Sequence, residues 1–272
     1  MKIIISHDVD HLWRNDHYRD LIYPKLWVRS TLELFKGEYG IKEWGHRMMS
    51  PFNKVRHRIE EVMEFDKANG IPSSFFFGME KGLGMSYGYK NAIEIIKAVD
   101  EAGFDVGVHG IAYDDLDNIQ KERDLLKKII NRDDFGIRMH YVRFSENTFN
   151  YLNEAGYIFD TTEFDKLSRD NCLKEPHKVG NMWEFPLNIM DGYLPKKLED
   201  KKRVTKELIK KAENEKLTYL TILFHDYLYS KGYETDKKWY IWLIDYLKGN
   251  GYEFISYKDA IKELNEGING KK

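Results

Sequence analysis

One junction, in which a helix ends at glycine and leads into a strand, recurs along this chain and restricts the folds open to it. It reads Ala102-Gly103-Phe104, Ala155-Gly156-Tyr157 and Asn250-Gly251-Tyr252 at three places, and Asn69-Gly70 marks a fourth. Glycine after a helix is typical of a left-handed cap, and the aromatic residue after it begins an apolar run. The recurrence predicts repeated helix–strand units and therefore an α/β fold.

Short apolar runs alternate with longer amphipathic segments along the chain, which is the pattern of a parallel sheet joined by helices. The predicted strands are Lys2–Ser6, Ser73–Gly78, Asp105–His109, Gly136–Met139, Met182–Phe185, Thr218–His225 and Tyr252–Ile255. The predicted helices are Lys54–Ala68, Lys90–Ala102, Leu116–Asn131, Glu146–Ala155, Lys201–Glu215, Thr235–Lys248 and Tyr257–Glu266. About seven such units predict a distorted (β/α) barrel, in which chemistry is found where strands end and helices begin.

The segment Leu12–Phe52 interrupts this alternation. It is rich in Trp, Tyr, Arg and Lys, and we expect it to form helices inserted after the first strand. About 40 residues with few aliphatic side chains would hardly fold alone, so we predict one domain over residues 1–272 with a helical insertion at 12–52. The aromatic side chains of this segment could stack on sugar rings, although packing is their commoner role.

Composition excludes several classes of protein. With 42% hydrophobic residues the chain can bury a sizeable core, and a net charge of −2 is not that of a general nucleic-acid binder. The apolar runs are far shorter than the roughly 20 residues that cross a bilayer, and no signal peptide precedes the first predicted strand. The single cysteine, Cys172, allows no intramolecular disulfide. We therefore expect a cytoplasmic protein without a membrane span.

The first predicted strand runs into two carboxylates flanked by histidines, Ser6-His7-Asp8-Val9-Asp10-His11. Acidic side chains at the end of a buried strand are costly unless they are paired, hydrogen-bonded or bound to a metal. Alternation along a continuing strand places Asp8 and Asp10 on one side, where one could bind a cation while the other stays ionised as a base. A turn whose carboxylates cap local amide groups is the alternative.

Polar residues also close three other predicted strands. His109 follows an apolar run and precedes Gly110, which suits a metal ligand, although a histidine satisfied by the backbone is equally common. Arg138 and Arg143 flank the next strand end, where arginine can orient a carboxylate or hold an anionic or polyhydroxy ligand. His225 ends a fourth apolar run, at a position suited to a general acid. Four polar strand ends together favour a shared site.

In order and content these motifs resemble those of the polysaccharide deacetylase superfamily of metal-dependent carbohydrate esterases. The resemblance runs from Lys2 to Ile255 and leaves out Leu12–Phe52. Applied to the acidic motif, it implies that Asp8 is the catalytic base and that Asp10 is a metal ligand.

The resemblance assigns further roles at the other strand ends. It implies that His109 binds the metal, that Arg138 orients the base, and that the backbone near Tyr141 helps to hold the oxyanion. It also implies that His225, in the strand end Leu223-Phe224-His225-Asp226, is the general acid. Asp160 is our prediction for the residue that orients this histidine.

The sequence departs from the family pattern at the second histidine of the metal motif, which is Tyr113 here. Because a neutral phenol is a poor zinc ligand, the third protein ligand is predicted to be Tyr113 as phenolate, His11 or His140, or to be missing. His140 stands where the family usually has proline. These changes resemble a divergent branch seen around surface-polysaccharide or lipopolysaccharide biosynthesis.

Together these features predict a hydrolase that uses a divalent ion, zinc in the first instance, to remove an N-acetyl or related acyl group from a sugar. The expected partner is an acetamido-sugar or glycan precursor, nucleotide- or lipid-linked, in contact with Tyr141 and Arg143. One alternative is a metal-free hydrolase of another carbon–nitrogen bond, such as a cyclic amide, which Tyr113 would favour. Another is a sugar-binding barrel without catalysis. The sequence leaves the identity of the sugar and the oligomeric state open.

Overall fold

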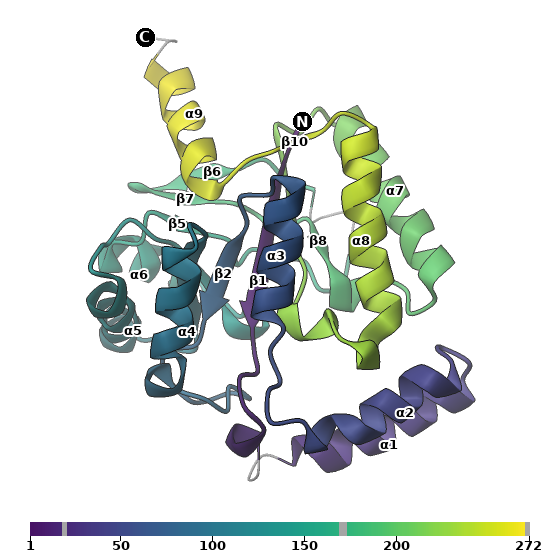
Figure 1. The fold of residues 1–272 in the computed structure, drawn as a ribbon. Coiled ribbons are helices and arrows are strands. Elements are labelled where there is room, and N and C mark those ends of the chain that lie inside the picture. The colour runs from purple at the N-terminus through teal and green to yellow at the C-terminus, as the bar shows by residue number, and fades with distance from the viewer. Residues whose placement is uncertain (18–20, 169–172, 270–272) are drawn as a thin grey trace.

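The structure is a computed structural model that describes residues 1–17, 21–168 and 173–269. Cys172 therefore lies outside the described residues. One sheet runs through the molecule in the order β6-β7-β5-β4-β3-β2-β1-β9-β8, with β10 beside β1. All strand pairs are parallel except β6 with β7, and helices surround the sheet (Figure 1).

The strands are short, and several of them have only two or three residues. They are β1 Lys2–Val9, β2 Ser74–Phe77, β3 Asp105–Gly110, β4 Ile137–Met139, β5 Phe159–Asp160, β6 His177–Val179, β7 Met182–Glu184, β8 Ile189–Met190, β9 Tyr219–Leu223 and β10 Glu253–Phe254. Among the described strands, β6 and β8 stand at the two ends of this order and do not pair with each other, so the sheet is a curled half-barrel and not a closed barrel. The predicted α/β class with a barrel-like parallel sheet is confirmed.

The helices follow the predicted alternation. They are α1 Ile22–Phe35, α2 Ile41–Met49, α3 Ile59–Asn69, α4 Tyr89–Glu101, α5 Leu116–Ile130, α6 Thr148–Ala155, α7 Leu198–Asn214, α8 Glu234–Gly249 and α9 Tyr257–Asn269. Gly70 ends α3 with a φ of 70° and Gly156 ends α6 with a φ of 91°. Both angles lie in the left-handed region that the sequence junctions predicted, where a side chain would add strain.

Alternation along β1 divides its residues between two faces of the sheet. Ile3 and Ile5 belong to a large apolar cluster that also contains Leu243 of α8. Ile4 belongs to a second, smaller cluster with Phe76 of β2 and Tyr257 of α9. Because side chains alternate along a strand, every second residue after Ile4 shares its face, which is how β1 delivers polar groups to the inner side of the half-barrel.

The helices α1 and α2 lie against each other beyond the carboxyl ends of β1 and β2, apart from the helices that cover the sheet (Figure 1). They fall within the segment 12–52, where the sequence predicted inserted helices. Within the described parts of the chain, no helix is both long enough and apolar enough to cross a membrane.

Candidate active site

A cavity of about 720 Å³ opens at the carboxyl ends of the strands. The strands and the segments directly after them supply one part of its wall: Asp8, Asp10, His109, His140 and His225. The helices α1 and α2 supply another part, which includes Lys25, Arg29, Glu43 and Arg47. Parallel strands end at the same edge of a sheet, so residues far apart in the sequence meet here.

His7 lies on the other face of β1 from this cavity. Its Nδ1 donates to the carbonyl oxygen of Phe224 at 2.7 Å, and its Nε2 lies 2.9 Å from Oδ2 of Asp66 in α3. Tyr240 of α8 donates to the other carboxylate oxygen of Asp66 at 2.7 Å. His7 therefore joins the sheet to the outer helices, and the first histidine of the acidic motif has a structural role.

Asp8 points to the inner side of the half-barrel, where Arg138 of β4 holds it. Nη1 of Arg138 donates to Oδ1 of Asp8 at 2.8 Å, and both side chains are buried. Nη2 of Arg138 also donates to Ser6 Oγ at 2.7 Å and to Tyr257 Oη at 3.2 Å. Burial alone would lower the pKa of Arg138, but the negative charge of Asp8 outweighs it, and the pKa is raised. The guanidinium therefore stays charged and holds one oxygen of the Asp8 carboxyl group in place.

Three nitrogen and oxygen donors meet next to Asp8. They are Asp10 Oδ1, His109 Nε2 and His140 Nδ1, and all lie within 4.8 Å of one another. His109 Nε2 is 3.3 Å from Asp10 Oδ1, and His140 Nδ1 is 3.4 Å from the same oxygen and 2.9 Å from His109 Nε2. Asp10 Oδ1 is buried and makes no well-formed hydrogen bond with any described residue.

The hydrogen-bonding of His109 fixes the tautomer of its neutral ring that suits a metal ligand. Its Nδ1 lies 3.0 Å from the carbonyl oxygen of Arg138, which can only accept, so Nδ1 carries the hydrogen. When the ring is neutral, the lone pair of Nε2 faces Asp10 and His140, as in histidine ligands oriented by a backbone carbonyl. One carboxylate and two imidazoles are a typical donor set for zinc, so these residues fit a divalent ion of that kind.

Neighbouring charges shift the pKa values of Asp10 and His109 in the direction opposite to the effect of burial. Burial alone would raise the pKa of Asp10, but contacts with His109 and His140 and the charge of His225 hold it well below its usual range. Burial alone would lower the pKa of His109, but the charges of Asp8 and Asp10 raise it. Asp10 is thus an anion at neutral pH, available to a cation.

His225, directly after β9, is oriented by Asp191 and not by Asp160, so the prediction of Asp160 was wrong. Nδ1 of His225 lies 3.0 Å from both carboxylate oxygens of Asp191, and the backbone N–H of His225 donates to Oδ2 of Asp191 at 2.6 Å. Burial would lower the pKa of His225, but Asp191 and Asp10 outweigh it and raise the pKa to about 10. Nε2 lies 3.6 Å from Asp10 Oδ2, on the cavity side.

Strand order explains the correction. Asp160 ends β5, which lies five places from β9 along the sheet, whereas Asp191 follows β8, the neighbour of β9. Asp160 instead accepts a hydrogen bond from Thr162 Oγ1 at 2.6 Å and lies beside the buried carboxyl group of Glu184. The sequence signal for Asp191 was weak, because Ile189–Met190 is a strand of only two residues.

Of the three alternatives for a third metal ligand, His140 lies in the donor cluster. Tyr113 is not among the residues that line the cavity and packs against the hydrophobic core. Glu122 of α5 accepts hydrogen bonds from the backbone N–H groups of Ile111 and Ala112, which holds the chain after β3 against α5. His11 lines the cavity but lies outside the cluster, and burial lowers its pKa to about 3.

The two residues predicted to bind substrate differ in position. Tyr141 lines the cavity, is 52% exposed and has a φ of 58°, a strained angle for a residue with a side chain. Arg143 is not among the lining residues, and its guanidinium lies 5.1 Å from the ring centre of Tyr141. The sequence did not single out Tyr227 or the cationic Lys25, Lys166 and Lys196, which also line the cavity.

Neither a protein-family model nor a curated protein matches this sequence. Solved structures do match. A protein from Mycobacterium smegmatis, provisionally named a polysaccharide deacetylase, matches with a TM-score of 0.63 and 14% identity over 98% of this chain and 91% of that chain. A polysaccharide deacetylase from Bacillus cereus has a TM-score of 0.47 and 14% identity over 94% of this chain and 91% of its own.

A structure with another named activity also matches. The 4-alpha-glucanotransferase from Thermococcus litoralis has a TM-score of 0.53 and 13% identity over 96% of this chain, but only 40% of that chain is covered. At such identities the likeness concerns the fold, and one fold can serve different reactions. The chain thus has the curled half-barrel fold found in polysaccharide deacetylases, as its sequence motifs predicted.

Proposed function

We propose that this protein is a metal-dependent carbohydrate deacetylase that hydrolyses an N-acetyl or related acyl group of a sugar. One observation carries the proposal. A carboxylate held by a buried arginine, a cluster of three metal-ligand atoms and a histidine of raised pKa meet at one cavity. Acyl hydrolysis needs a base, a source of positive charge and an acid in this arrangement.

Asp8 is proposed as the base. Its ion pair with Arg138 fixes one carboxylate oxygen, so that Oδ2 is left to take a proton from water. As the water oxygen bonds to the acyl carbon, its proton passes to Asp8. The backbone near Tyr141 is proposed to help hold the oxygen anion that develops.

His225 is proposed as the acid. Its pKa of about 10 means that it is protonated at neutral pH, and Asp191 fixes its ring so that Nε2 faces the cavity. The proton on Nε2 passes to the sugar nitrogen as the carbon–nitrogen bond breaks, which releases acetate and a free amine.

Asp10, His109 and His140 are proposed to hold the divalent ion, with zinc as the first candidate. When bound, such an ion supplies the positive charge that polarises the acyl carbonyl group. His109 is held for this task by the carbonyl oxygen of Arg138. Tyr113 is no longer needed as a ligand, so no observation favours the metal-free alternative that it had suggested.

The cavity walls support a substrate that carries negative charge next to the sugar. Lys25, Arg29, Lys166 and Lys196 line the same cavity as the proposed catalytic groups. Phosphate oxygens would pair with such side chains, so we propose a nucleotide- or lipid-linked acetamido-sugar of surface-polysaccharide or lipopolysaccharide biosynthesis. A cytoplasmic reaction and a single catalytic domain over residues 1–272 remain part of this proposal.

The test measures acetate release from UDP-N-acetylglucosamine and from chito-oligosaccharides by the purified protein, before and after removal of bound metal with a chelator. We expect acetate release that is lost with the metal and restored by zinc. Asp8→Asn should lose turnover by about a thousandfold while circular dichroism stays unchanged. Full activity in Asp8→Asn would contradict the proposal, as would folded, zinc-loaded protein that releases no acetate from any acetamido-sugar tried.

A further inference from the structure

The helix α1 presents its apolar side to solvent. Val28, Leu32 and Phe35 are 63%, 56% and 83% exposed, whereas Ser30 and Glu33 of the same helix are buried. With Pro24, which is also exposed, the apolar residues recur at intervals of three or four and form one stripe along the helix. A helix on the surface of a globular domain normally buries such a stripe.

Ion pairs fix α1 in this orientation. Glu33 accepts from Arg47 Nη1 at 2.9 Å, and Arg47 Nη2 donates to Glu43 at 2.7 Å, all three being buried. Tyr39 donates to the carbonyl oxygen of Ser30. Because the polar side of α1 is held by these contacts at the cavity, the stripe cannot turn inward without breaking them.

The stripe is part of a larger exposed apolar area. Of the thirteen large hydrophobic side chains that are exposed among the described residues, eight belong to α1, α2 and their immediate flanks: Leu21, Trp27, Val28, Leu32, Phe35, Ile41, Met49 and Phe52. Such a concentration in about one eighth of a chain marks an interaction surface rather than the scattered exposure found on every protein.

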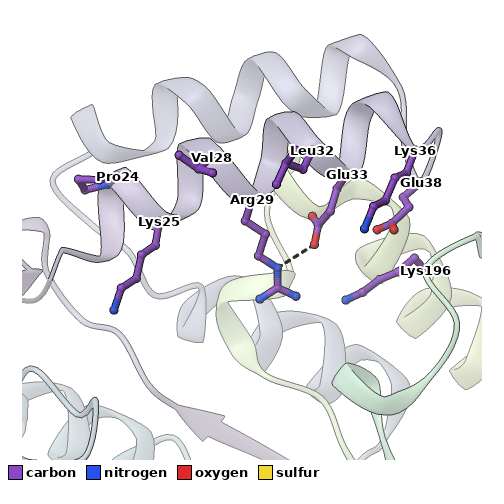
Figure 2. A pocket seen from close by; sticks show the side chains of 9 residues that line it. All are labelled: Pro24, Lys25, Val28, Arg29, Leu32, Glu33, Lys36, Glu38 and Lys196. Atoms are coloured by element: carbon purple, nitrogen blue, oxygen red, sulfur yellow. Dashed lines mark hydrogen bonds and ion pairs between the residues drawn. The ribbon is translucent and has the colours of Figure 1, made fainter.

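Cationic side chains border the stripe. Lys25 and Arg29 lie beside it on α1, and Lys36 follows directly after the helix. Lys196 reaches toward Arg29 across a groove of about 590 Å³ (Figure 2). Residues 21–58 contain eight Lys or Arg and three Asp or Glu, although the whole chain carries a small negative net charge. An apolar stripe with a basic border complements anionic lipid headgroups above an acyl layer.

We propose that the stripe of Pro24, Val28, Leu32 and Phe35 docks on an anionic lipid surface, with α1 lying in the plane of the headgroups. Lys25 and Arg29 line both the groove and the active-site cavity, so docking would bring the cavity mouth to the lipid surface. A second copy fits the stripe less well, because antiparallel pairing of two α1 helices would bring Lys25 of one copy near Lys36 of the other. The proposal does not depend on the hydrolase reaction.

The test is co-sedimentation of the full chain with vesicles of phosphatidylcholine alone or mixed with phosphatidylglycerol. We expect binding to the mixed vesicles that weakens with added salt. The triple variant Val28→Ser, Leu32→Ser, Phe35→Ser should lose at least about tenfold in affinity, and Lys36→Gln about fivefold. Leu167→Ser, which removes an exposed apolar side chain elsewhere, is the matched control and should bind like the wild type.

Three results would overturn the proposal. One is no binding to mixed vesicles at low salt by protein with a native circular dichroism spectrum. Another is equal binding to neutral and mixed vesicles, which would remove the role of the basic border. The last is a dimer in light scattering that the triple variant converts to a monomer, since the stripe would then be a subunit interface.

Discussion

The two walls of the active-site cavity are built on different principles. The strand-end wall, defined here as Asp8, Asp10, His109, His140 and His225, stands on the parallel sheet, and its residues are positioned by strand register and by buried hydrogen bonds. The helical wall belongs to α1 and α2, and it is held by the ion pairs of Arg47 with Glu33 and Glu43. The sheet positions the proposed catalytic residues, whereas a few side-chain contacts position the helices on the opposite side of the cavity.

The difference predicts that loss of a proposed metal ligand from the strand-end wall lowers activity strongly and stability little. Asp10→Asn should abolish stoichiometric zinc binding and lower turnover by a thousandfold or more, about 4 kcal/mol in the barrier. Elemental analysis and acetate release measure the two effects, and thermal unfolding in chelator should change little. Zinc retained at full occupancy in this variant would show that the ion lies elsewhere.

The helical wall should respond in the opposite way. Arg47→Met leaves Glu43 buried without its cation and Glu33 with only the largely exposed Arg29, and we expect it to lower the free energy of unfolding by about 3 kcal/mol. Urea denaturation measures the loss. If turnover of the folded variant falls as far as it does in Asp10→Asn, the division between the two walls is wrong.

A narrower comparison concerns two buried aspartates outside the five residues of the strand-end wall. Asp191→Asn removes the charge that orients His225 and should lower turnover about a hundredfold. Asp160→Asn is the matched control, since this side chain bonds to Thr162 and lies away from the cavity, and turnover per folded molecule should stay near wild type. The reverse ranking would restore the original prediction from the sequence.

The His225–Asp191 pair should also make the free energy of unfolding depend on pH. The folded pKa of His225 is about 10 and its ordinary value is 6.5. The pair therefore stabilises the protein fully below pH 6.5 and loses this contribution as the pH rises toward 10. In chelator, the stability difference between wild type and His225→Gln should shrink over that range, and a constant difference from pH 6 to 10 would contradict the assignment.

The smallest effect is expected on the outer side of α1. Arg29 pairs with Glu33 at 2.7 Å, but its side chain is largely exposed. Arg29→Gln should therefore cost less than about 1 kcal/mol in unfolding free energy, in contrast to Arg47→Met. Comparable losses in the two variants would show that the exposed pair, and not the buried one, holds the helical wall.

The sequence predicted the strand-end wall better than any other part of the site. His109 and His225 could be found because each closes an apolar run, and parallel strands carry such ends to one place. Asp191 could not, since choosing it requires the spatial order of strands, and β8 is too short to leave a pattern. His140 stayed one of three alternatives because it follows β4 in a turn where direction cannot be inferred from alternation.

The inserted segment was predicted to be helical, but its exposed apolar side was not. An amphipathic pattern identifies an apolar and a polar side of a helix, but it does not show which side is buried in the folded protein. In α1 the decision is made by Arg47, a residue of the next helix, through its contact with Glu33. Only tertiary contacts carry this information.

Arg138 contacts two of the proposed catalytic-site residues, one through its side chain and the other through its main chain. Its side chain pairs with Asp8, and its main-chain oxygen fixes the ring of His109. A point mutation can delete the first contact but leaves the second, because every residue has a main-chain oxygen. A descendant of this protein could therefore lose the proposed turnover in one step and keep the proposed ion site, so that ion binding would be a poor guide to whether a related chain is still an enzyme.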